Sequence, residues 1–256
     1  MIKGAIQKFL NARGFAVIRY SAGYSPEHLK IFQAIREFTA TSLERQAGLV
    51  SAVEYISDNK IPGAFVECGV WRGGSTMAAA LALLQRGDTS RDLYLFDTFE
   101  GMSAPTADDV MFDGQTAKQL LDAEKPTEER ANYWCLASLE DVKRNLYSTG
   151  YPKEKLHFIK GKVEDTLPGQ APDQIALLRL DTDWYESTAH ELKHLFPRLS
   201  ANGVLIIDDY GHWLGARKAV DEYFAQQPLR PLLQRLDYTG RLAIKTSPAG
   251  DADVGR

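Results

Sequence analysis

The chain has 256 residues, of which 44% are hydrophobic, and a formal net charge of −4 from 30 Lys and Arg against 34 Asp and Glu. This length corresponds to one large domain, or one domain with appendages, that buries a core without disulfides or metals. The ordinary composition excludes wholesale disorder, and the negative charge argues against a protein that binds nucleic acid. With only two cysteines, Cys68 and Cys135, a cysteine-based zinc site is excluded and a reducing compartment is favoured.

The first 26 residues carry Lys3, Lys8, Arg13 and Arg19 but no acidic residue. No apolar stretch with a small-residue cleavage site follows them, so a secretory signal is not predicted. Apolar residues at positions 2, 6, 9 and 10 fit one face of a short helix, which either packs on protein, as we favour, or binds a membrane surface. No run approaches the length of a membrane span, so we expect no span and a cytoplasmic protein.

Residues 26–60 are predicted to be helical. Pro26 suits a first helical turn, and Thr41-Ser42-Leu43-Glu44 has the pattern of a capping box that opens a helix to about Asn59. Ile61-Pro62-Gly63 then ends the helical region. We expect residues 1–60 to form an N-terminal helical extension or cap.

Apolar runs and helical segments alternate from residue 61 onward. The expected strands are Ala64–Val70, Leu93–Phe99, Leu156–Gly161, Ile175–Asp181 and Val204–Asp208, and the expected helices are Ser75–Arg86, Leu139–Tyr147, Ser187–Leu199 and Ala216–Gln226. Leu232–Leu236 and Arg241–Lys245 have the pattern of a terminal antiparallel hairpin. This order predicts an α/β fold over 61–246, with a doubly wound, mostly parallel, seven-stranded, Rossmann-like sheet, and a flexible tail over 247–256.

The segment from about residue 100 to 137 interrupts this alternation because it has no strand pattern. A connection of this length is either a functional lid or a flexible insertion. We favour a lid, because the segment follows the carboxyl edge of the predicted sheet, where ligands bind in such folds. Thr116–Glu124 could form a short helix inside it.

The loop Glu67-Cys68-Gly69-Val70-Trp71-Arg72-Gly73-Gly74-Ser75 follows the first predicted strand and opens a helix. Glycines there allow close approach of a ligand, and the helix N-terminus offers unpaired N–H groups. Asp97 ends the second strand, where a carboxylate can take both hydroxyls of a ribose. Trp71 stands where a dinucleotide-binding motif has its middle glycine, which argues against a nicotinamide site. The pattern resembles motif I of S-adenosylmethionine-dependent methyltransferases instead. A turn with a purely structural role is the alternative.

Paired carboxylates end the fourth and fifth predicted strands, in Asp181-Thr182-Asp183 and Asp208-Asp209. Parallel strands bring these ends to one edge, where the carboxylates would repel one another unless a cation neutralised them. Oxygen ligands without His or Cys suit Mg²⁺, with Mn²⁺ as a substitute. The alternative is that these residues cap helices and loops.

Several other residues allow two interpretations. His212 could act as a general base but as a lone loop histidine is more often a surface or packing residue. His190 and His194 have the spacing of a two-histidine metal site, yet without an adjacent glutamate base we interpret them as a solvated face. Trp71, Trp184 and Trp213 follow strand ends and could either line an acceptor site or pack in the core.

Ile61–Gly74, Leu95–Pro105 with its Phe96-Asp97-Thr98-Phe99-Glu100-Gly101-Met102, and Leu178–Tyr210 together resemble the macrocin O-methyltransferase (TylF-type) family. The similarity spans about Thr41 to Phe224. It implies a class I methyltransferase fold, S-adenosylmethionine as methyl donor, a divalent metal, and a sugar hydroxyl on a glycosylated natural product as acceptor. Thr182 and Trp184 depart from the family's usual Gly and Leu, so the acceptor itself is not transferred.

The resemblance assigns roles to residues of this sequence. Asp181, Asp208 and Asp209 would be metal ligands, and Asp181 would also accept the proton of the acceptor hydroxyl, a role open to Asp183 or His212 as well. The donor site would comprise Glu67, Cys68, Gly69, Val70, Gly73, Ser75, Asp97, Thr98, Lys162, Val163 and Asp181. The alternatives are a nicotinamide-dependent oxidoreductase and a catalytically silent binding subunit on the same fold. We expect a homo-oligomer.

Overall fold

The computed structural model describes residues 9–10, 12–13, 23–127 and 133–246 and contains a seven-stranded sheet in the order β3-β2-β1-β4-β5-β7-β6. The strands are β1 (Ala64–Cys68), β2 (Leu93–Asp97), β3 (Leu156–Lys160), β4 (Ile175–Leu180), β5 (Leu199–Ile207), β6 (Gln234–Arg235) and β7 (Arg241–Ile244). The first five are parallel, whereas β7 runs antiparallel to β5 and β6 antiparallel to β7. The predicted fold class and terminal hairpin are therefore confirmed.

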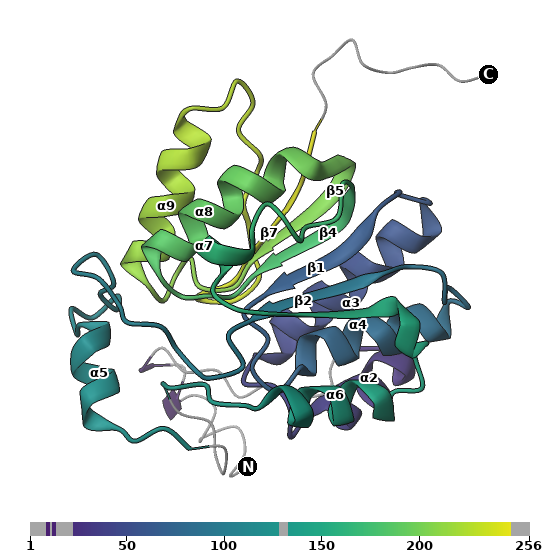
Figure 1. Cartoon of the computed structure of the whole chain (residues 1–256), viewed down its shortest axis with the longest axis horizontal. Helices are drawn as coiled ribbons and strands as arrows, with labels where there is room; N and C mark the ends of the chain where they lie inside the picture. The colour runs from purple at the N-terminus through teal and green to yellow at the C-terminus, as the bar shows by residue number, and fades with distance from the viewer. Residues whose placement is uncertain (1–8, 11, 14–22, 128–132, 247–256) are drawn as a thin grey trace.

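Helices cover both faces of the sheet (Figure 1). One face carries α2 (Pro26–Ile35), α3 (Leu43–Asp58), α4 (Gly74–Gln85) and α6 (Leu139–Ser148), and the other carries α7 (Val163–Thr166), α8 (Tyr185–Leu195) and α9 (Leu214–Ala225). Short 3₁₀ turns lie at Lys153–Lys155 and Phe196–Arg198. Within the described residues, no helix is long and apolar enough to cross a membrane.

Several predicted boundaries are wrong, and two of them have a cause in the local structure. Helix α3 is capped by Ser42, whose hydroxyl accepts the Arg45 N–H, so the helix begins one residue later than the predicted Thr41 capping box. Strand β5 begins at Leu199 instead of Val204, because Leu199 pairs with Ile175 before the register shifts. The sequence Ser200-Ala201-Asn202-Gly203 interrupts the apolar run and hides this first part of the strand.

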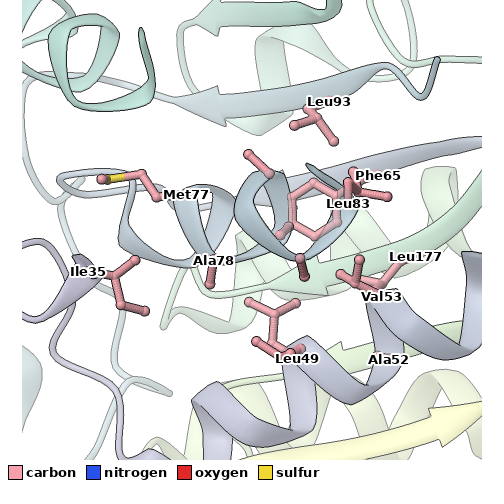
Figure 2. Packing of buried hydrophobic residues seen from close by; sticks show 14 of the residues in the cluster. Ile35, Leu49, Ala52, Val53, Phe65, Met77, Ala78, Leu83, Leu93 and Leu177 are labelled. Carbon is pink, nitrogen blue, oxygen red and sulfur yellow. The ribbon is translucent and has the colours of Figure 1, made fainter. Parts of the chain in front are cut away.

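In the core on the α4 face, α3 and α4 pack against each other and α3 also contacts β4 and β5 (Figure 2). The small residues Ala78, Ala79 and Ala80 of α4 are fully buried, which allows α4 to approach its neighbours closely. Phe65 and Leu93 of the sheet pack in the same cluster. The first turn of α4 is thereby fixed at the end of β1, where the predicted donor loop lies.

The insertion between β2 and α6 packs against the sheet-and-helix core over its described part, and its helix α5 (Ala117–Ala123) stands apart from both helix layers (Figure 1). Thr116 and Gln119 form a true capping box at its start. Met111 and Leu121 pack with Trp184 and Trp213 in a separate apolar cluster. The insertion therefore has a small core of its own.

Asp109 connects the insertion to α8. Its carboxylate is completely buried and accepts hydrogen bonds from the Tyr185 N–H at 2.8 Å and the Thr106 N–H at 2.6 Å. Helix α8 consequently begins at Tyr185, two residues before the predicted Ser187, since a side chain distant in sequence supplies its cap. Most of the basic N-terminal segment and the tail from residue 247, for which we predicted a short helix and flexibility, lie outside the described residues.

Candidate functional site

A cavity of about 520 Å³ opens at the carboxyl edge of the sheet, where β1, β2, β4 and β5 end. Its wall includes most of the predicted site residues: Gly69, Val70, Ser75, Asp97, Thr98, Lys162, Val163, Asp181, Asp208 and Asp209. Glu67, Cys68 and Gly73, also predicted for the donor site, do not form part of the wall. The two groups of predicted residues, from the glycine loop and from the carboxylates, thus face one cavity.

The glycine loop is shaped by its protein neighbours. Gly69 has a φ of +78°, and a side chain there would overlap the backbone carbonyl of Asp181. A side chain at Gly74 would likewise overlap the backbone carbonyl of Phe38, to which the Gly74 N–H donates a hydrogen bond of 3.1 Å. The sequence predicted that these glycines admit a ligand. In the structure they allow the loop to contact the Asp181 strand end on one side and the α2–α3 connection on the other.

The Asp97 carboxylate holds this loop in place. Oδ2 accepts hydrogen bonds from the Val70 N–H at 2.6 Å and the Trp71 N–H at 3.2 Å, and Oδ1 accepts one from the Phe99 N–H at 2.7 Å. Burial raises the pKa of Asp97, and the hydrogen bonds from these backbone groups oppose that rise. Three acceptor positions of the carboxylate are therefore used by the protein, so its visible role is to position the loop, and the predicted ribose contact stays a prediction.

Glu67 lies beneath the loop in a buried network. One of its oxygens accepts a hydrogen bond from the Thr76 hydroxyl, and Oε1 accepts one of 2.6 Å from Arg179 Nη1. The Arg179 side chain is only 2% exposed, and the same Nη1 also donates to Asp181 Oδ2 at 2.6 Å. Arg179 therefore links β1 to the carboxylates at the end of β4.

A second arginine reaches the carboxylates from α3. Arg45 lines the cavity, donates a hydrogen bond to Asp208 through Nη1, and lies 3.0 Å from Asp237 through Nε. Ser42 donates a 2.7 Å hydrogen bond to the same Asp237. The N-terminal helices thereby join the carboxylate cluster to the β6–β7 hairpin, and sequence reasoning missed both arginines.

Asp181, Asp208 and Asp209 each offer an oxygen within 4.8 Å of the others. Burial, with repulsion from neighbouring aspartates, raises the pKa of Asp181 well above its ordinary value although Arg179 opposes the shift. Burial and Asp183 likewise raise the pKa of Asp209. Burial and the charge of Asp181 raise the pKa of Asp183 to about 7. Arg45 and Arg179 together therefore do not neutralise all of the negative charge of these aspartates.

These residues fit a divalent cation. The donor set consists of three carboxylate oxygens, the ligand type that Mg²⁺ and Mn²⁺ prefer. Oxygens that lie within 4.8 Å of one another can all bind one ion at about 2.0–2.6 Å. Asp208 Oδ1 is buried and lies 2.8 Å from Arg179 Nη2, yet accepts no hydrogen bond of good geometry. An acceptor of this kind has capacity for a cation.

The other histidines, tryptophans and aspartate considered from the sequence differ in whether they line the cavity. His212 and Trp213 line the cavity, and so does Trp71, whereas Trp184 packs beside Trp213 with ring centroids 5.0 Å apart. The His190 and His194 rings lie on α8 outside the cavity wall, with centroids 4.4 Å apart and a tilt of 53° between the ring planes. Asp183 also lines the cavity and is hydrogen-bonded to Asp209 and Trp213. His212 and Asp183 therefore remain near the carboxylates as the sequence predicted.

Part of the cavity wall comes from the α2–α3 connection, which the sequence did not single out, and part from the insertion, which the sequence predicted to lie at the ligand-binding edge. Phe38, Thr39, Ala40 and Thr41 form the α2–α3 connection over the glycine loop, and Tyr133 and Cys135 come from the insertion. Arg72 fixes the connection by donating to the Glu37 carbonyl at 3.0 Å. No local pattern marks these residues, because they reach the cavity only through tertiary packing.

Comparison with known proteins gives one consistent result. The profile of the family described as Macrocin-O-methyltransferase (TylF) matches residues 35–243. The chain is 36% identical over 202 residues to the 8-demethyl-8-(2,3-dimethoxy-alpha-L-rhamnosyl)-tetracenomycin-C 4′-O-methyltransferase of Streptomyces olivaceus, covering 79% of this chain and 73% of that protein. It is 33% identical, with the same coverage, to the demethyldecarbamoylnovobiocin O-methyltransferase of Streptomyces niveus. The solved structure of the O-methyltransferase NovP superposes with a TM-score of 0.73 at 28% identity, over 86% of this chain and all of that one.

Proposed function

The chain belongs to the macrocin O-methyltransferase (TylF) family of S-adenosylmethionine-dependent O-methyltransferases, and on this premise we propose that it methylates a sugar hydroxyl of a glycosylated natural product with the help of a divalent cation. The observation that carries the proposal is the meeting of the glycine loop and the acidic cluster in one cavity. The family assignment argues against both alternatives that the sequence left open, a nicotinamide-dependent oxidoreductase and a catalytically silent binding subunit. The name of the Streptomyces olivaceus relative includes a rhamnosyl group, which supports a sugar-bearing acceptor.

For the donor, we assign the wall made by the glycine loop and the ends of β2 and β3. The N–H groups at the start of α4 can bind an anionic group of the donor, which supports a role for Ser75. Lys162 and Val163 begin α7 beside Gly161 and face the same cavity. Glu67, Cys68 and Gly73 support this wall from behind.

For the acceptor, we assign the side of the cavity that carries the aspartates. Asp181 would accept the proton of the attacking hydroxyl, because it lies at the end of β4 beside both the glycine loop and Asp208. Methyl transfer requires the hydroxyl oxygen to be held in line with the donor methyl group, and this positioning supplies much of the rate. A cation held by Asp181, Asp208 and Asp209 would supply positive charge that lowers the pKa of the hydroxyl.

The test combines donor, acceptor and metal. The enzyme should transfer one methyl group from S-adenosylmethionine to a member of a panel of glycosylated natural products, detected by mass spectrometry. Chelation should abolish turnover and Mg²⁺ should restore it. Asp208→Asn should lose turnover and cation binding while retaining S-adenosylhomocysteine affinity, whereas Asp88→Asn, a matched change at a carboxylate outside this cavity, should retain all three. Full turnover in excess chelator would contradict the metal assignment, and methylation of aglycones alone would contradict the sugar assignment.

Two further expectations stay predictions. We expect a cytoplasmic enzyme, as inferred from the cysteine content, and a homo-oligomer. Sedimentation of the purified protein tests the second.

A further inference from the structure

Three aromatic side chains form a rim at the mouth of the cavity, and we infer that this aromatic rim, made of Phe112, His212 and Tyr238, binds a flat apolar aglycone of the acceptor. The inference rests on the proposed function, since it specifies the acceptor of the same site. The three residues come from the insertion, the β5–α9 loop and the β6–β7 turn. His212 and Tyr238 line the cavity, and Phe112 lies next to both.

The rim is fixed before any ligand binds. Ring centroids lie 5.8 Å apart for Phe112 and His212, 6.0 Å for Phe112 and Tyr238, and 5.9 Å for His212 and Tyr238. The Phe112 N–H donates to the His212 carbonyl at 2.9 Å, and His212 Nδ1 lies 3.0 Å from the Tyr238 hydroxyl. These bonds hold three separate segments together, so binding would cost little conformational entropy.

The rim is exposed although it is apolar. Phe112 is 57% and Tyr238 52% exposed, so two large rings stand side by side in solvent next to a ligand cavity. Apolar surface that is grouped at the edge of a cleft marks a binding site more often than scattered single residues do. Aromatic faces bind flat apolar groups by stacking, and no acidic side chain belongs to the trio.

The rim also stands at a defined place relative to the carboxylates. The His212 and Trp213 N–H groups each donate a 3.0 Å hydrogen bond to the Asp209 carbonyl, so one short loop carries both the acidic cluster and the rim. A cavity of about 520 Å³ lies within the ~300–1,000 Å³ that suits one small ligand, so donor and sugar ring would largely fill it. The polar interior would then bind the hydroxylated sugar, and the aglycone of the same glycoside would extend out of the cavity and contact the apolar rim.

The experiment compares two acceptors that share a sugar, methyl α-L-rhamnoside and 2-naphthyl α-L-rhamnoside, at saturating S-adenosylmethionine. Wild type should prefer the naphthyl glycoside through a lower KM. Phe112→Ala and Tyr238→Ala should each reduce this preference in kcat/KM by about fivefold to tenfold, the size of an aromatic stacking contact. Tyr238→Phe keeps the ring and should retain most of the preference, and Tyr147→Ala, an aromatic on α6 outside the cavity wall, should retain all of it.

The outcomes separate the rim from the proposed function. The rim assignment would be overturned if wild type showed no preference between the two glycosides. It would also be overturned if the variants lost kcat/KM equally for both glycosides or changed the oligomeric state. If wild type methylates neither glycoside, these rhamnosides are not substrates and the panel of glycosides decides the sugar assignment. Calorimetric binding of the two rhamnosides to the complex with S-adenosylhomocysteine then tests the rim separately. Tighter binding of the naphthyl glycoside by wild type, lost in Phe112→Ala, would support the rim assignment. Equal or undetectable binding of the two glycosides would reject it.

Discussion

Arg45 of α3 and Asp208 at the end of β5, which are 163 residues apart in sequence, form an ion pair in the wall of the cavity. Asp208 is also a proposed cation ligand. The guanidinium would therefore share the carboxylate with the proposed cation. Burial of the Arg45–Asp208 pair strengthens their interaction because little water screens it. The N-terminal helices consequently contribute to the electrostatics of the site as well as to the core.

Arg45→Met should tighten cation binding. Removing the Arg45 guanidinium leaves Asp208 with Arg179 as its remaining cationic partner among the described residues, so the affinity for Mn²⁺ should rise about tenfold, or ~1.4 kcal/mol. Electron paramagnetic resonance titration of free Mn²⁺ measures this. Arg217→Met, which removes an exposed arginine paired with Asp221, is the control. Equal affinity in both variants would show that Arg45 does not share its carboxylate with a cation.

Asp97→Asn should weaken S-adenosylhomocysteine binding by about 1–3 kcal/mol, because an amide cannot accept all three backbone N–H groups of the loop. Calorimetry with S-adenosylhomocysteine and its 2′-deoxyribose analogue separates two roles. Equal losses for both ligands assign loop positioning, and a loss confined to the natural ligand assigns the predicted ribose contact. Unchanged affinity for both ligands in a folded variant would reject Asp97 as a donor-site residue.

Asp109→Ala should loosen the insertion and the start of α8 together. The substitution leaves the Tyr185 and Thr106 N–H groups without their acceptor, at a cost of about 1–3 kcal/mol. Hydrogen exchange should therefore increase at both amides. Asp113→Ala, an exposed aspartate that bonds only within its own turn, should leave them protected. Protection at Tyr185 that survives Asp109→Ala would contradict the capping role.

Asp141→Asn should flatten the acid dependence of stability. Partial burial alone would raise the pKa of Asp141, but hydrogen bonds and charge from Arg72 outweigh it and lower the pKa. A carboxylate with a lowered pKa stabilises the fold above its ordinary pKa and loses that contribution as the pH falls through the lowered value. The variant should therefore be less stable at pH 7 and lose less stability on acidification.

Urea unfolding between pH 7 and pH 3 measures this difference. Glu140→Gln, a change at the exposed neighbour on the same helix, should follow the wild-type curve. A parallel curve for Asp141→Asn would mean that the pair with Arg72 contributes nothing to acid sensitivity.

The sequence by itself determined the sheet, the glycine loop and the acidic strand ends. These features are local: apolar runs form the strands, and the aspartates follow directly after β4 and β5. Parallel strands then bring the ends to one edge without further information. Sequence reasoning missed Arg179, although a single charge inside the apolar run of β4 is a signal that buried partners are required; in the structure these are Glu67, Asp181 and Asp208.

Only the tertiary structure decided what surrounds those strand ends. Arg45 and the α2–α3 connection line the cavity, and Phe112 packs against the lining residue His212. They come from segments whose own sequence patterns are those of an ordinary helix, loop and insertion. Asp109 caps a helix 76 residues further along the chain. Such contacts depend on how whole elements pack, which neither periodicity nor capping patterns encode, so the charge balance and the rim of the site were set by packing at long range.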